Sequence, residues 1–327
     1  MARTLLTIAA LSVLAGASLP AAATPVADPT AQPPVTVAFS LSSASVIQYE
    51  PVILHYQIIN HASSDTKVSF AGQERPAAWL GLQCIGPDGS PVEQVKSLDL
   101  PRSLVSGRGC IGPAESLHGA VVLQRMFDIS EPRRYSLRIT PSLAWASEDK
   151  SRQGIVTSSQ VLPFEVGSPD STRLSRMMDA LLIKALGRRE DYAARTTAIQ
   201  ALFSIPETEA LRAWERLLEQ AIMDGNDTVV GMAVEEMVRV PTSARADLLA
   251  EIVWGRYRAW LDLASPGIES RAGGLLVINP GPLVLATASR GLHNMYWAGD
   301  ASLKEHIRDL FIKHEGAMPD IKNPIIH

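Results

Sequence analysis

The sequence has neither an excess of one charge nor a long apolar run in its body. It holds 30 basic and 34 acidic residues, for a net charge of −4 at pH 7. Proteins that bind nucleic acid or anionic membranes carry basic patches, so this near balance argues against both partners. After the N-terminal region no run of 18 apolar residues occurs, and we expect a soluble processed chain without a transmembrane segment.

The common catalytic motifs are also missing. The chain has no GxSxG elbow, no HExxH, no glycine-rich phosphate loop and no CxxC. Two S-x-x-K matches, at 64–67 and 147–150, fall in polar stretches between expected strands, whereas acylating enzymes need this serine at a buried helix start. His306 and His314 are the nearest pair on an expected helix, and their spacing does not suit zinc. We therefore expect no enzyme activity, no cofactor and no metal.

An export signal opens the chain. Residues 1–23 read MARTLLTIAALSVLAGASLPAAA, with one charge at Arg3, an apolar run and three closing alanines. This pattern is typical of a secretory signal peptide cleaved near Ala23, because the apolar run is too short to span a bilayer. Residues 24–34 follow as a linker rich in proline and alanine. We expect a periplasmic or secreted protein.

Cys84 and Cys110 are the only cysteines, and each begins the tetrapeptide Cys-Ile-Gly-Pro. The residues around the two tetrapeptides do not repeat, which argues against a duplication. An even pair of cysteines in an exported chain predicts a disulfide, which would stabilise the fold by about 3.5 kcal/mol in the chain-entropy description. The alternative is a pair of free buried thiols.

Between residues 35 and 167, short segments alternate apolar and polar residues. PVILHYQIIN at 51–60 and RRYSLRIT at 133–140 are examples, and GPDGS at 86–90 reads as a turn between strands. A period of two predicts antiparallel strands with one face on a core. We expect an antiparallel β-sandwich domain over 35–167.

The stretches YEPVILHYQIINHASSDTKVSF (49–70) and EPRRYSLRI (131–139) resemble secreted bacterial immunoglobulin-like domains. The resemblance is closest to the BsuPI-like group, whose members are similar to an intracellular proteinase inhibitor. It implies an immunoglobulin-like fold and allows, as an alternative function, inhibition of exported proteases.

From residue 168 to residue 327 the apolar period changes to 3.6, which predicts an all-α domain. Helices are expected at 172–186, 189–204, 207–223, 227–239, 242–264 and 300–314, and Asp170 or Ser171 should cap the first. AIQALFSIP (198–206) matches AVEEMVRVP (233–241), and ATASRGLHNM (286–295) matches in part. Such recurrence resembles HEAT-like helical repeats, and the rival interpretation is an ordinary helical bundle. Because two clear repeats cannot bury a full core alone, we expect the sandwich to cap one end.

Two stretches of the helical half hold the candidate binding residues. In WGRYRAWLDL (254–263) Arg256 projects into an apolar helix face. Its aliphatic stem either packs on apolar neighbours with the charged head in water, or its guanidinium forms an ion pair or holds a ligand at a domain junction. The irregular stretch SPGIESRAGGLLVINPGP (265–282) is either a packed plug, an added strand or a partner site. The residues that we single out for partner binding or a domain junction are Arg256, Trp260, Arg271, Leu275, Leu276 and Ile278.

A β-sandwich joined to helical repeats, without a catalytic constellation, favours a non-catalytic exported binding or scaffold protein. We expect a protein partner in the cell envelope or outside the cell. The alternatives are an inhibitor of exported proteases, and a hydrolase built from scattered residues such as His118 or His293.

Overall fold

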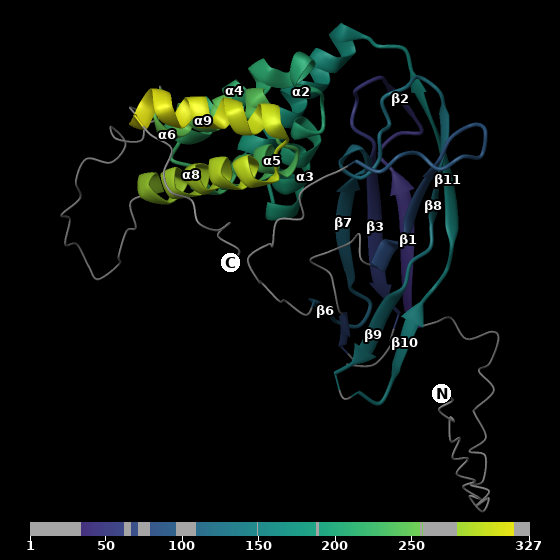
Figure 1. The fold of residues 1–327 in the computed structure, drawn as a ribbon. Helices are drawn as coiled ribbons and strands as arrows, with labels where there is room; N and C mark the ends of the chain where they lie inside the picture. Colours follow the sequence, from purple (N-terminus) through teal and green to yellow (C-terminus); the bar gives the residue numbers. More distant parts are fainter. Residues whose placement is uncertain are drawn as a thin grey trace, which may run out of the picture. The chain divides into compact units, whose positions relative to one another are not determined.

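The computed structural model describes residues 34–61, 67–70, 79–95, 109–148, 150–187, 190–255, 257 and 280–316. Within this part of the chain all strands come first and the long helices follow (Figure 1). The expected order of a β half and then an α half is confirmed. Residues 34–327 belong to one unit, which contains both halves.

The strands form three sheets, and their pairs are antiparallel except for one. The first sheet contains β1 (Val35–Leu41), β3 (Ile53–Asn60) and β7 (Ser116–Val122), in that order. The second has the order β10 (Gln153–Val156), β9 (Leu143–Ser147), β4 (Val68–Phe70) and β6 (Gly109–Ile111). The third has the order β2 (Ser45–Ile47), β11 (Gln160–Gly167), β8 (Arg134–Ile139) and β5 (Leu82–Ile85), and β2 runs parallel to β11.

The period-two pattern holds in β3, whose residues point alternately into and out of the core. Leu54, Tyr56 and Ile58 are buried in one apolar cluster with residues of all three sheets. Gly119 of β7 lies opposite Tyr56, and a Cβ atom at Gly119 would overlap the tyrosine ring. The glycine is therefore required by packing, because the ring fills the space of its missing side chain.

The described residues include seven α-helices. They are α2 (Ser171–Leu186), α3 (Tyr192–Phe203), α4 (Glu207–Met223), α5 (Asp227–Arg239), α6 (Ser243–Val253), α8 (Pro280–Ala298) and α9 (Ala301–Glu315). Asp170 caps α2 by accepting from the backbone N–H of Arg173, as expected. None of the described helices combines the length and hydropathy needed to cross a bilayer.

Two helix predictions need correction. The helix expected over 242–264 ends at Val253, because Trp254 leaves helical geometry with φ −126° and ψ −18°. The helix α8 was not among the expected helices, since its start at Pro280 lies in a stretch interpreted as irregular. Proline is tolerated in a first helical turn, where its missing N–H has no partner to lose.

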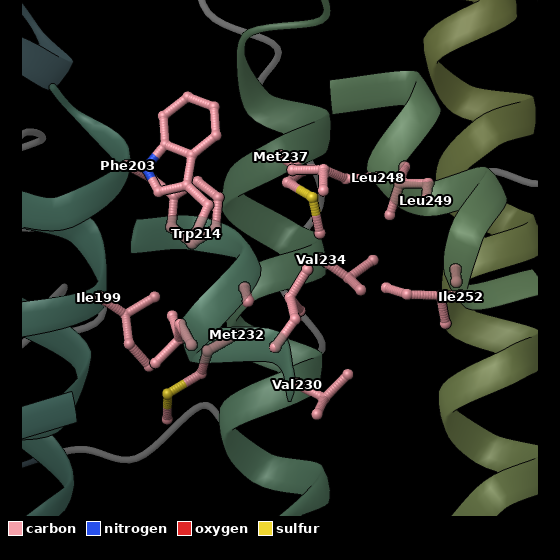
Figure 2. Close-up of a cluster of buried hydrophobic side chains, with 14 of the residues drawn as sticks. Ile199, Phe203, Trp214, Val230, Met232, Val234, Met237, Leu248, Leu249 and Ile252 are labelled. Atoms are coloured by element: carbon pink, nitrogen blue, oxygen red, sulfur yellow. The ribbon is translucent and has the colours of Figure 1, made fainter. Parts of the chain in front are cut away.

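The matched segments lie on neighbouring helices of one core. The 198–206 segment is on α3, the 233–241 segment on α5 and the 286–295 segment on α8, and α5 packs against both of the others. The aligned small and large positions are buried in all three: Ala198, Leu202, Ala233, Met237, Ala288 and Leu292. Figure 2 shows side chains of α5 directed toward α3 and α6, with Met232 on the side of Ile199 of α3 and Val234 on the side of Ile252 of α6.

The helical core continues into the β half. Val122 of β7 is fully buried in the helical cluster, and Tyr49 and Ile53 pack against it. Apolar packing therefore joins the last residues of β7 to the helices, and α3 is the helix that packs on β7.

Candidate functional site

The residues singled out from the sequence for partner binding lie outside the described residues. They are Arg256, Trp260, Arg271, Leu275, Leu276 and Ile278. Their role stays a prediction. The expected signal peptide and most of the expected linker, residues 1–33, lie outside the described residues as well.

The predicted disulfide is wrong, because both cysteines are free thiols. Cys84 lies on the inward face of β5 with no exposed surface, and Cys110 lies on β6 of a different sheet and is exposed. Burial raises the pKa of the Cys84 thiol to about 11, against weaker opposing effects of a backbone hydrogen bond and of Arg133. Cys110 is therefore the more reactive of the two thiols in the folded protein.

A buried ion pair links the two halves. Arg125, in the short 3-10 turn η1 (Leu123–Arg125), donates from Nε and Nη2 to the two carboxylate oxygens of Glu236, at 3.1 and 2.7 Å. The two side chains are only 11% and 10% exposed. These residues are 111 positions apart, so no local sequence pattern indicates the pair.

Arg245 of α6 lies beside this pair. Its guanidinium donates to the backbone carbonyls of Glu236 and Phe203 and sits 4.8 Å from the Trp214 ring. Burial lowers the pKa of Arg245 to about 10, and the negative charges of Glu236 and Glu207 oppose that shift. The cluster fixes the junction and offers no open site.

The outward face of the β1-β3-β7 sheet brings together three histidines that the sequence separates. At one end of this face Val122 is buried in the helical core and the half-buried Ile53 packs against it, and the rest of the face is exposed or half-buried. We call the open part the histidine face. It consists of Thr36, Ala38, Ser40, His55, Gln57, Ile59, His61, Ser116, His118 and Ala120. The strand register places Gln57 opposite His118, and His55 opposite Ala120, one row nearer the helices.

Hydrogen bonds to hydroxyl groups orient two of the imidazoles. Nε2 of His61 lies 2.7 Å from Oγ1 of Thr36, and Nε2 of His118 lies 3.0 Å from Oγ of Ser116. Burial, and then the positive charge of Lys184 on α2, lower the pKa of His55. Strands β1, β3 and β7 contain no Asp, Glu, Lys or Arg, so the histidines are the only basic side chains of this face.

The Ser116–His118 pair is the closest approach to a catalytic arrangement on this face. A serine becomes a nucleophile when its base is itself oriented by a third group. No described residue is hydrogen-bonded to the other ring nitrogen of His118, which is exposed. The geometry therefore supplies a polar surface rather than an activated nucleophile. Among the described residues, no group of three or more His, Cys, Asp or Glu side chains could hold a metal ion.

A second open feature is a hollow of about 530 Å³ on the β10-β9-β4-β6 sheet. Ser69 and Ala146, which pair across β4 and β9, line it together with Cys110 on β6. Lys67 and Lys150 are also among its lining residues. Its lining is of mixed polarity and also includes Phe70, Trp145 and Glu148.

Comparisons with known proteins give no identity. No family model matches the chain, and no curated protein does. Among solved structures, a structural-genomics target named SoR45 is 14% identical, with 41% of this chain and 85% of that chain covered and a TM-score of 0.21. AvmM, a catalyst of macrocyclisation in alchivemycin A biosynthesis, is 15% identical over 42% of this chain and 90% of its own, with a TM-score of 0.19. Scores this low carry no argument about fold or activity.

Proposed function

We propose that this chain is a non-catalytic, exported binding or scaffold protein that acts through a protein partner in the cell envelope or outside the cell. The observation that carries the proposal is the histidine face. It is an open sheet surface with exposed imidazole and small side chains, interleaved with half-buried amide and hydroxyl groups.

The rigidity of the surroundings supports this function. The same sheet is anchored at buried Val122 and half-buried Ile53, and the Arg125–Glu236 pair ties the turn after β7 to α5. A surface held in place before binding loses little conformational entropy when a partner docks, so more of its interaction energy appears as affinity. The signal-like N-terminus supports export.

The test is site-specific photocrosslinking in an extract of the cell envelope. The photoreactive residue p-benzoylphenylalanine replaces Ala38, an exposed residue of the histidine face, or Lys313, an exposed residue of α9. We expect one discrete protein adduct from position 38 and none of the same mass from position 313. No adduct from either position, together with measured turnover of ester or peptide substrates, would rule out the binding function.

A further inference from the structure

One edge of the β1-β3-β7 sheet is open. Strand β7 pairs with β3 on one side, and no described strand pairs with its other side. The hydrogen bonds at the two ends of this pair run from Asn60 to the Glu115 carbonyl and from Leu123 to the Val52 carbonyl. Because bonded positions alternate along an antiparallel pair, the odd-numbered residues of β7 face β3, and the even-numbered residues direct their backbone groups to the open edge.

Three residues supply the unpaired groups of this edge: Ser116, His118 and Ala120. No described residue is hydrogen-bonded to the backbone N–H or C=O of any of them. The helical core covers the edge beyond them, at Val122, whereas every residue from 116 to 121 keeps exposed surface. Proteins ordinarily block such an edge with proline, a charged side chain or a bulge, and β7 contains no proline and no Asp, Glu, Lys or Arg.

The inward face of β7 is incompletely covered as well. Leu117 and Val121 pack against the sandwich core but are only half-buried. Their partners on β3, Ile58 and Leu54, have no exposed surface. The difference arises because β3 has a neighbouring strand on both sides and β7 has one. A further strand beside β7 would cover Leu117 and Val121 with its own side chains.

We propose that the protein partner adds an extended segment to the open edge of β7, as an antiparallel fourth strand of this sheet. Main-chain hydrogen bonds to the three unpaired positions supply affinity, and alternate side chains of the segment supply specificity. The two faces of β7 define the segment: apolar side chains cover Leu117 and Val121, and polar side chains continue the histidine face. This inference rests on the proposed binding function.

The test uses the full chain without residues 1–23 and a fluorescein-labelled peptide, (Thr-Val)4-amide, whose Kd is measured by fluorescence anisotropy. When the valines of an antiparallel strand point inward, the threonine N–H groups face β7 and the valine N–H groups face solvent. N-methylation of the threonine nitrogens should therefore weaken binding at least about tenfold, because hydrogen bonds to β7 are lost. N-methylation of the valine nitrogens is the matched control and should leave Kd within about twofold, because it removes none of these bonds.

Two proline variants locate the binding edge. His118→Pro removes an N–H from the open edge of β7 and should abolish peptide binding. Ile155→Pro removes one from the outer edge of β10, where Ile155 is 61% exposed, and should keep it. Circular dichroism checks that both variants fold, and the N-methylated peptides test the same hydrogen bonds in the unchanged protein.

Failure of the unmodified peptide to bind, equal binding of the two N-methylated peptides, or equal loss in both proline variants would overturn the assignment. A dimer of the full chain that His118→Pro separates would assign the edge to a second copy and overturn it as well. If the partner crosslinks at position 38 and His118→Pro leaves that adduct unchanged, the binding function stands and this inference falls.

Discussion

Replacing Glu236 by glutamine should destabilise the protein more than replacing its partner Arg125. Glu236→Gln removes the carboxylate charge that faces the Arg125 guanidinium at a site where the arginine side chain is 11% exposed. It also leaves Arg245 dependent on the charge of Glu207 alone. Removing one member of a buried ion pair costs about 3–5 kcal/mol, and we expect Glu236→Gln to fall in this range.

Arg125→Met should cost less, about 1–3 kcal/mol, for two reasons. The Glu236 carboxylate keeps Arg245 as a positive neighbour, and methionine refills part of the volume of the arginine stem. Urea unfolding at pH 7, followed by circular dichroism, measures both free energies of unfolding.

The control is an exposed pair of the same chemistry, Asp179 and Arg216, at 2.9 Å and 52% and 65% exposed. Asp179→Asn should cost less than about 1 kcal/mol, because water screens such pairs. The reasoning fails if Glu236→Gln costs no more than Asp179→Asn, or if Arg125→Met costs more than Glu236→Gln.

Three further predictions follow from local packing and burial. Gly119→Ala should destabilise the protein by about 1–3 kcal/mol in urea unfolding, because the added Cβ would overlap the facing Tyr56 ring. Gly231→Ala on helix α5 should stabilise it by about 0.5–1 kcal/mol, because the added Cβ meets no atom within 4 Å. The opposite sign for either variant would contradict the packing. Thiol titration should find two free thiols in the denatured protein. In the folded protein only Cys110 should be labelled fast, and fast labelling of Cys84 would contradict its burial. Burial lowers the pKa of His293, with Glu315 opposing the shift, so the folded state resists its protonation and stability should fall as pH drops below about 6.5. His293→Phe should reduce that loss in unfolding measured at pH 7 and 5.5, and an unchanged pH dependence would assign the loss to other groups.

The sequence alone was sufficient for the β-then-α order and for most helix boundaries. The helices expected at 207–223 and 227–239 match α4 and α5 residue for residue. Periodicity works here because amphipathic helices and half-buried strands record their burial locally, every 3.6 or every two residues. The recurrence of small and large residues also located helices that share one core, including α8, which the helix expectations omitted.

The cysteine pair shows where sequence reasoning failed. Cys84 and Cys110 share a tetrapeptide and an even count, yet they lie on strands of different sheets, one inside the core and one exposed. Whether two cysteines meet is decided by how strands pair across the chain, and sequence spacing does not record it.

The candidate site and the junction were decided by tertiary structure for the same reason. No sequence pattern links His55, His61 and His118, and the antiparallel register of β3 and β7 places them on one face. Arg125 and Glu236 meet only because α3 packs on β7 and brings the helical core to the end of that strand. Local pattern thus determined what each segment becomes, and long-range packing determined which side chains share a surface.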